Sequence, residues 1–225
     1  NLQSYIKQKK MPVALPDVLS SDGKRVYMRS QRFDLQGRRT VIKPEDQNDQ
    51  DGGLHLFSPV GMLDDTWFHR GYWIYGKNAG EGWGEWFIPG RLVPTGRILV
   101  FDENRVYGYS RDPEYLCNSS VLEYRLFAAG KQIVPERVKN LKRAKQDVVN
   151  WNTRAIQLTA AQLTAVDYKW LKEHPPLLAR AMALAGKTLF VAGPPDVVDE
   201  KKAWGRDLNI AQRRKLDEQL AALEG

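Results

Sequence analysis

A hairpin-like pattern occurs four times in this chain, and it constrains the fold more than any other feature. Each copy has a short apolar run, a polar turn, and then β-branched and aromatic residues. The copies span Val18–Ser30, Gly61–Gly76, Ile98–Ser110 and Met182–Pro194. In the first copy, Asp22-Gly23 supplies the positive φ angles that a two-residue hairpin turn needs. The first three copies recur at roughly 37–43 residues, the length of one four-stranded propeller blade. The pattern therefore predicts an all-β chain made of several four-stranded antiparallel blades of a β-propeller.

Further strands and two helical segments are predicted between and after these copies. Val121–Ala129 alternates like a strand and is expected to end at Gly130-Lys131. Thr159–Gln162 fits a capping box that would start a helix through Val166. Val166–Leu171 fits an outer strand equally well, so we expect a short helical turn followed by that strand. The apolar spacing in Asn209–Leu223 predicts a C-terminal helix.

These elements divide the chain into four parts. We expect propeller blades at 1–134, with a glycine- and tryptophan-rich loop at 77–96, and a partly helical insertion at 135–166. A further blade at 167–200 and a helical segment at 201–225 follow. A blade takes roughly 40–50 residues, so 225 residues provide too few blades to close a ring. We therefore expect an incomplete ring that further segments of a larger chain, or a partner, would complete.

The chain is basic, with a formal net charge of +7. The excess is concentrated at Lys7–Lys10, Lys24–Arg39 and Lys131–Lys145. Such a charge favours anionic partners, but the same side chains can simply solvate the outside of a sheet-rich protein. We favour solvation and do not expect a nucleic-acid partner, because no nucleic-acid-binding motif accompanies the charge. No run of about 18 apolar residues occurs, so no transmembrane segment is expected.

Few residues in the chain fit a catalytic or metal-binding pattern. The single Cys117 excludes an internal disulfide and a multi-thiolate zinc site, and the three histidines lack a metal-ligand spacing. The densest polar set comprises Asp64, Asp65, His69 and Arg70. Paired carboxylates beside a histidine can act as acid and base, but the two aspartates also suit a hairpin turn, which we favour.

Large aromatic residues in the 77–96 loop are the other candidate binding groups. Trp83, Trp86 and Phe87 can stack on sugars or bases, or they can fill the space between blades. The residues expected to contact a ligand are Asp65, His69, Arg70, Trp83 and Trp86. We expect no catalytic residue, no cofactor and no metal.

Four segments resemble one bacterial family, the exported proteins with pyrroloquinoline-quinone-like β-propeller repeats of the quinoprotein-alcohol-dehydrogenase-like superfold. The segments are Leu15–Asp34, Leu56–Gly76, Gly96–Leu116 and Ala179–Glu200. The resemblance implies a repeat protein that is exported to the periplasm or to the outside of the cell. The quinone-binding repeat signature is blurred, since only Ala129-Gly130-Lys131 and Ala185-Gly186-Lys187 match its turn. A vicinal cysteine pair is impossible with one cysteine.

The resemblance therefore supports the fold and argues against quinone-dependent catalysis. We expect a non-enzymatic β-propeller scaffold that binds a protein or a polysaccharide partner through its blade loops. The alternative is a redox-associated or hydrolytic enzyme domain that uses the central channel of the propeller.

Overall fold

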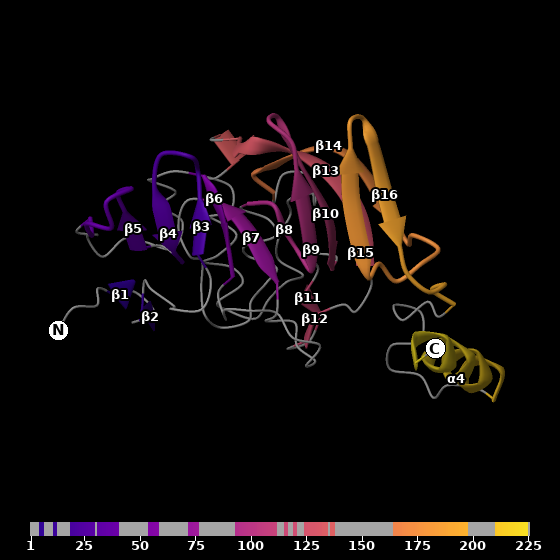
Figure 1. The fold of residues 1–225 in the computed structure, drawn as a ribbon. Coiled ribbons are helices and arrows are strands. Elements are labelled where there is room, and N and C mark those ends of the chain that lie inside the picture. The colour runs from indigo at the N-terminus through magenta and orange to yellow at the C-terminus, as the bar shows by residue number, and fades with distance from the viewer. Residues whose placement is uncertain are drawn as a thin grey trace.

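The computed structural model describes a little over half of the chain. It covers residues 5–6, 11–12, 19–29, 31–40, 54–58, 72–76, 93–111, 115–116, 119–120, 124–134, 136–137, 164–197 and 210–224. Within these ranges the fold is mostly β, with several small antiparallel sheets and a C-terminal helix (Figure 1). The described sheets are separate and do not close on one another. The prediction of a β-rich antiparallel fold is confirmed at this level.

The first sheet contains the first predicted hairpin. Its strands are β3 (Leu19–Ser21), β4 (Val26–Met28) and β5 (Gln31–Phe33). The hairpin is confirmed, and Gly23 has φ +82° in the turn between β3 and β4. The two-residue turn is wrong, because Ser21 pairs with Val26 and residues 22–25 form a four-residue connection in which Asp22 has no positive φ. A second turn lies at Gly37, which has φ +78°, and a bridge joins Phe33 and Arg39 across it.

The second sheet joins strands that are far apart in the sequence. They are β6 (His55–Phe57), β7 (Trp73–Gly76) and β8 (Thr95–Gly96), with β7 in the centre. β7 is the last part of the predicted Gly61–Gly76 hairpin. The rest of that hairpin, and most of the 77–96 loop, lies outside the described residues.

The third sheet is a four-stranded antiparallel meander. Its strands are β9 (Ile98–Phe101), β10 (Arg105–Arg111), β13 (Tyr124–Ile133) and β14 (Val166–Glu173). One boundary prediction is wrong: β13 continues through Gly130-Lys131, because Gly130 pairs with Arg105 inside the sheet. The outer strand expected at Val166–Leu171 is confirmed as β14. Val166 pairs with Ile133, which excludes the alternative of a helix that extends through it.

The remaining described elements are a hairpin, two very short strand pairs and the helix. They are β15 (Ala181–Ala185) with β16 (Thr188–Ala192), β1 (Tyr5–Ile6) with β2 (Met11–Pro12), β11 (Tyr115–Leu116) with β12 (Ser119–Ser120), and α4 (Ile210–Glu224). The fourth predicted hairpin is confirmed, with Gly186 at φ +58° in its turn. The C-terminal helix is confirmed as well. Gln219 of α4 is buried and accepts a 3.4 Å hydrogen bond from the Val197 backbone N–H, whereas Ile210 is exposed.

The four main sheets follow one another in chain order across the molecule (Figure 1). β3 lies beside β6, β8 beside β10, and β15 beside β9. The two central strands of the third sheet, β10 and β13, carry buried side chains on both faces: Val106 and Phe127 lie on one face, and Ala128 and Tyr109 lie on the other. The edge strand β14 is mostly exposed. Apolar burial therefore stabilises the centre of this sheet.

Candidate functional site at the junction of the first two sheets

The structure does not test the site residues predicted from the sequence. Asp64, Asp65, His69, Arg70, Trp83, Trp86 and Cys117 all lie outside the described residues. The described residues contain two other features with binding chemistry. One is a buried polar and aromatic group between the first two sheets, and the other is a set of exposed apolar side chains on the later strands.

Two of the predicted hairpins share the same side-chain arrangement at the turn. Oδ1 of Asp22 accepts hydrogen bonds from the backbone N–H groups two and three residues ahead, at 2.9 and 2.8 Å. Oδ1 of Asp102 accepts the equivalent bonds at 2.7 and 2.8 Å. In each hairpin a tyrosine five residues after the aspartate donates its hydroxyl to Oδ2: Tyr27 to Asp22, and Tyr107 to Asp102. The Asp-x-x-Arg-Val-Tyr sequence therefore encodes a locally fixed turn.

These hydrogen bonds keep both aspartates ionised. Burial acts to raise the pKa of Asp22, but the bonds from Tyr27 and from the backbone outweigh it, and the pKa lies below its usual value. The backbone N–H groups of Asn104 and Arg105 hold the pKa of Asp102 below its usual value too. Charged acceptors make stronger hydrogen bonds than neutral ones, so the turns are firm at neutral pH. Their role is to fix the hairpin geometry.

An aromatic stack joins the first sheet to the second. The rings of Tyr27 on β4 and His55 on β6 lie 3.7 Å apart and nearly parallel, and Phe57 packs against His55 at 5.0 Å. His55 is 1% exposed, and its Nε2 atom lies 2.7 Å from the carbonyl oxygen of Arg29. A carbonyl oxygen only accepts, so Nε2 carries the hydrogen and donates it. This contact ties β6 to the residue that follows β4.

Arg29 is the most unusual residue at this junction. It is 3% exposed, and its backbone is in the left-handed region at φ +55°. None of the residues that the structure describes accepts a hydrogen bond from its Nε, Nη1 or Nη2 atoms, all of which are buried. Burial lowers the pKa of Arg29 to about 10, while Tyr72 acts in the opposite direction. The prediction that the basic residues of Lys24–Arg39 solvate the surface is wrong for Arg29, because this side chain is buried.

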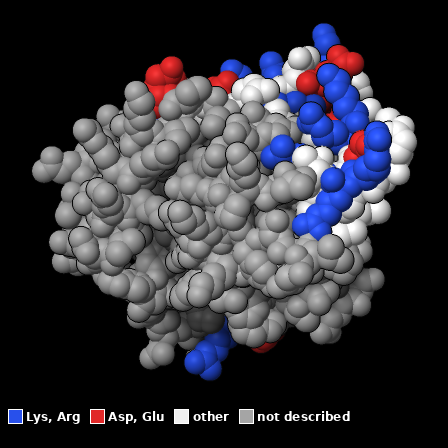
Figure 2. Space-filling view, turned by 90° about the vertical axis from the view of Figure 1, so that its left-hand side faces the viewer, with Lys and Arg blue, Asp and Glu red and all other residues white. Residues whose placement is uncertain are grey.

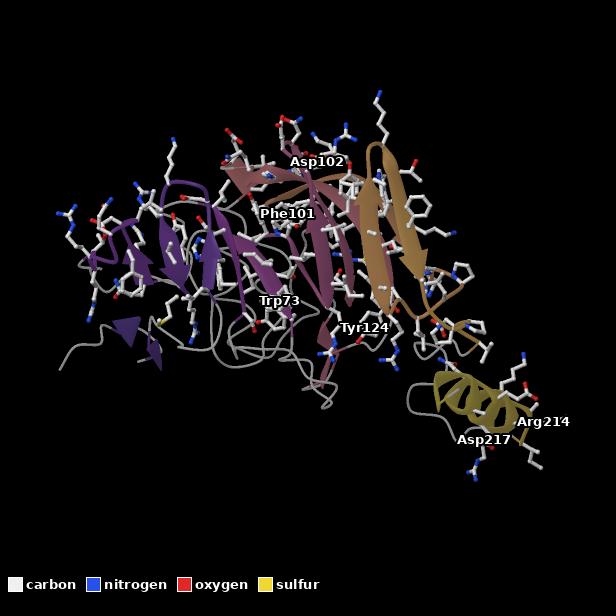
Figure 3. All side chains as sticks on the ribbon, in the orientation of Figure 1. Trp73, Phe101, Asp102, Tyr124, Arg214 and Asp217 are labelled. Atoms are coloured by element: carbon white, nitrogen blue, oxygen red, sulfur yellow. The ribbon has the colours of Figure 1, made fainter. Side chains whose placement is uncertain are left out.

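The later strands carry large apolar side chains on the surface. Phe101 at the end of β9 is 45% exposed, and Phe190 on β16 is 58% exposed. On β14, Trp170 and Leu171 are 39% and 36% exposed. Figure 3 shows Phe101 next to Asp102, at the tip of the β9–β10 hairpin. The exposure of these residues could not be predicted from the sequence, because their alternation within strands is the same whether or not a neighbouring sheet covers them.

Basic side chains dominate the described surface on the side of the first sheet. In Figure 2, Lys and Arg side chains run along the upper right edge of the view, with few acidic ones among them. Acidic partners offset two of these charges: Arg38 pairs with Asp34 at 2.6 Å, and Arg25 lies 3.9 Å from Asp22. Exposed pairs of this kind contribute little to stability. The excess of Lys and Arg side chains gives this side of the molecule a preference for anionic partners.

The described residues contain no group of three or more His, Cys, Asp or Glu side chains arranged to hold a metal ion. The described helix is neither long nor apolar enough to cross a membrane. No protein-family model, curated protein or solved structure matches this chain.

Proposed function

We propose that this chain is a non-enzymatic binding scaffold of the β-propeller type, which engages a protein or polysaccharide partner. Two features of the fold support the propeller architecture. Successive antiparallel sheets follow the chain order, and the third sheet is a four-stranded meander whose central strands carry buried side chains on both faces. A propeller blade needs both features, because each blade packs between two neighbours.

The contacts between sheets support a rigid scaffold. Besides the Tyr27–His55 stack, Tyr75 on β7 packs against Phe101 on β9 at 5.2 Å. Nζ of Lys131 on β13 lies over both of these rings, at 5.4 and 5.2 Å from their centroids. Aromatic and cation–π contacts between sheets hold the surface side chains in fixed positions, which lowers the entropic cost of binding.

The exposed edge strand β14 carries the proposal. Trp170 and Leu171 are adjacent and exposed, and in the described sheet β14 pairs with β13 alone. Tryptophan is the residue type most enriched at the energetic centres of protein interfaces. An edge strand also offers backbone donors and acceptors to an incoming strand. Lys169 and Lys172 flank the pair and discourage two copies of the chain from pairing edge to edge. A different partner is therefore favoured at this edge.

Site-specific photocrosslinking in the cells that make the protein tests this proposal. A photoreactive amino acid at position 170 should give a discrete protein adduct, whereas the same group at the exposed turn residue Lys187 should not. A polysaccharide partner would instead appear as binding on a glycan array that Trp170→Ser abolishes. The proposal is wrong if neither signal appears, if position 187 gives the same adduct, or if the purified protein turns over a quinone or alcohol substrate.

A further inference from the structure

We propose that Arg29 is the cationic anchor of a buried binding site for a single carboxylate group. This inference is independent of the partner at β14. It begins with the backbone. Arg29 is the first of the two residues between Met28 and Gln31, which pair with each other at the end of the β4–β5 hairpin. Such a position favours Gly, Asn or Asp because φ is positive. An arginine here is held at φ +55° at a conformational cost, which points to a role for its side chain.

The side chain adds a second cost. A guanidinium carries five N–H donors and stays charged at neutral pH, so burying it without an acceptor is strongly unfavourable. Its neighbour Gln31, which is equally buried, uses its Nε2 group fully by donating to the carbonyl oxygens of Arg32 and Thr40 at 3.0 and 2.8 Å. The turn therefore satisfies its buried amide but not its buried cation.

The second buried arginine has an internal hydrogen-bond partner for one of its guanidinium nitrogens. Nη2 of Arg125 donates a 2.8 Å hydrogen bond to the hydroxyl of Tyr168, and the guanidinium lies 5.0 Å from the centre of the same ring. The described residues give Arg29 no such arrangement. Its backbone carbonyl accepts the hydrogen bond from His55, whose ring stacks on Tyr27, and Tyr72 is close enough to act on its pKa. The guanidinium itself is a buried charge that needs a counterion.

Charge balance selects the kind of anion. Arg29 supplies one positive charge, and the planar fork of its N–H groups matches the two oxygens of a carboxylate. A phosphate with nearly two negative charges would remain partly uncompensated in the same buried site. The site therefore fits a monoanionic carboxylate, either as a small free acid or as an acidic side chain of a bound protein.

Urea unfolding in sodium acetate and in sodium chloride, at equal ionic strength, tests the site. Acetate should raise the unfolding midpoint of the wild-type protein, and a tenfold excess over its Kd should raise the folding equilibrium constant about elevenfold. Arg29→Met should remove this response and should be more stable than the wild type in chloride. Lys24→Met removes the same charge from an exposed position and should keep the acetate response. A general stabilising effect of acetate would persist in Arg29→Met, so the two effects separate.

The source of the carboxylate is tested with a short peptide that has blocked ends and a single glutamate. A response to acetate alone assigns the site to small acids, and a response at lower peptide concentration assigns it to a protein partner. The proposal fails if the urea midpoint of the wild-type protein is the same in acetate and in chloride. This comparison uses the wild-type protein alone, so it does not depend on whether a variant folds. It also fails if phosphate acts at lower concentration than acetate. A third contrary result is an Arg29→Met variant that is less stable than the wild type in chloride, because the chain itself would then supply the counterion.

Discussion

The hydroxyl of Tyr27 donates a 2.6 Å hydrogen bond to Oδ2 of Asp22, and the corresponding bond from Tyr107 to Asp102 measures 3.2 Å. Tyr27 is fully buried, whereas Tyr107 is partly exposed. The same turn therefore occurs in two environments. A shorter bond to a charged acceptor in a buried setting contributes more to stability, because water competes for it less well.

Tyr27→Phe should accordingly lower the free energy of unfolding by about 1–2 kcal/mol, and Tyr107→Phe by about 0.5 kcal/mol. Both substitutions keep the ring, so the stack of Tyr27 on His55 is preserved. Urea unfolding at pH 7 measures the two losses. An equal or larger loss in Tyr107→Phe would contradict the link between burial and bond strength in these turns.

Stability should fall in acid through the same turns. The pKa values of Asp22 and Asp102 lie below the ordinary value, and so does that of Asp34, which accepts hydrogen bonds from the backbone and side chain of Arg38. A depressed pKa in the folded state means that the unfolded chain binds protons first as the pH falls. The stabilisation is therefore fully present above the ordinary aspartate pKa of 3.8 and is lost as the pH falls through the folded values.

Urea midpoints measured from pH 7 down to pH 2 should show this decline. Asp22→Asn combined with Asp102→Asn should be less stable at pH 7 and should lose less stability in acid than the wild type. An unchanged acid slope in that variant would show that other carboxyls control the decline.

Local sequence predicted the turns because their chemistry is local. Gly23 and Gly186 each occupy the left-handed conformation that glycine favours in a turn. The pairing of β6 with β7 could not be predicted in this way, because the two strands are joined by a long connection from Ser58 to Tyr72 and not by one tight turn. The burial of Arg29 could not be predicted either, because no residue within its own hairpin signals it.

The predicted end of β13 is wrong, because a glycine that is typical of a strand end lies inside the sheet. Gly130 was expected to end its strand, yet β13 continues through it to Ile133. The same type of residue at Gly186 does form a turn, because its φ is +58°. The difference depends on whether a partner strand is present, as Arg105 of β10 is for Gly130. Long-range pairing therefore overrides the local preference at Gly130.

Gly186 offers a test of conformational strain without steric conflict. A Cβ added there would meet no atom within 4 Å, so only its φ of +58° opposes a side chain. Gly186→Ala should lower the free energy of unfolding by about 1 kcal/mol, and Gly186→Asn by less, since Asn tolerates the left-handed region. Urea unfolding of the two variants side by side checks the order. Equal losses would mean that the strain lies elsewhere in the β15–β16 turn.

Gly108 offers the opposite test, in which space rather than backbone conformation is limiting. A Cβ at this position of β10 would overlap the ring of Phe127 and would lie 2.7 Å from Cδ2 of Leu99. Phe127 is fully buried in the core of the third sheet and cannot move without disturbing Val166 and Ala129. Gly108→Ala should therefore destabilise the protein by about 2–3 kcal/mol.

Gly130→Ala is the matched control in the same sheet, because its nearest contact would be the carboxylate oxygen of Asp167 at 3.0 Å. That side chain is 38% exposed and is free to move aside, so the change in stability should stay within about 0.5 kcal/mol. Phe127→Leu should recover part of the loss caused by Gly108→Ala, because it shortens the side chain that the new methyl group meets. A double-mutant cycle in urea measures this coupling. If the two losses of stability are additive, the ring of Phe127 is not the cause of the loss in Gly108→Ala. The contact with Leu99 or the backbone of β10 would then be the cause.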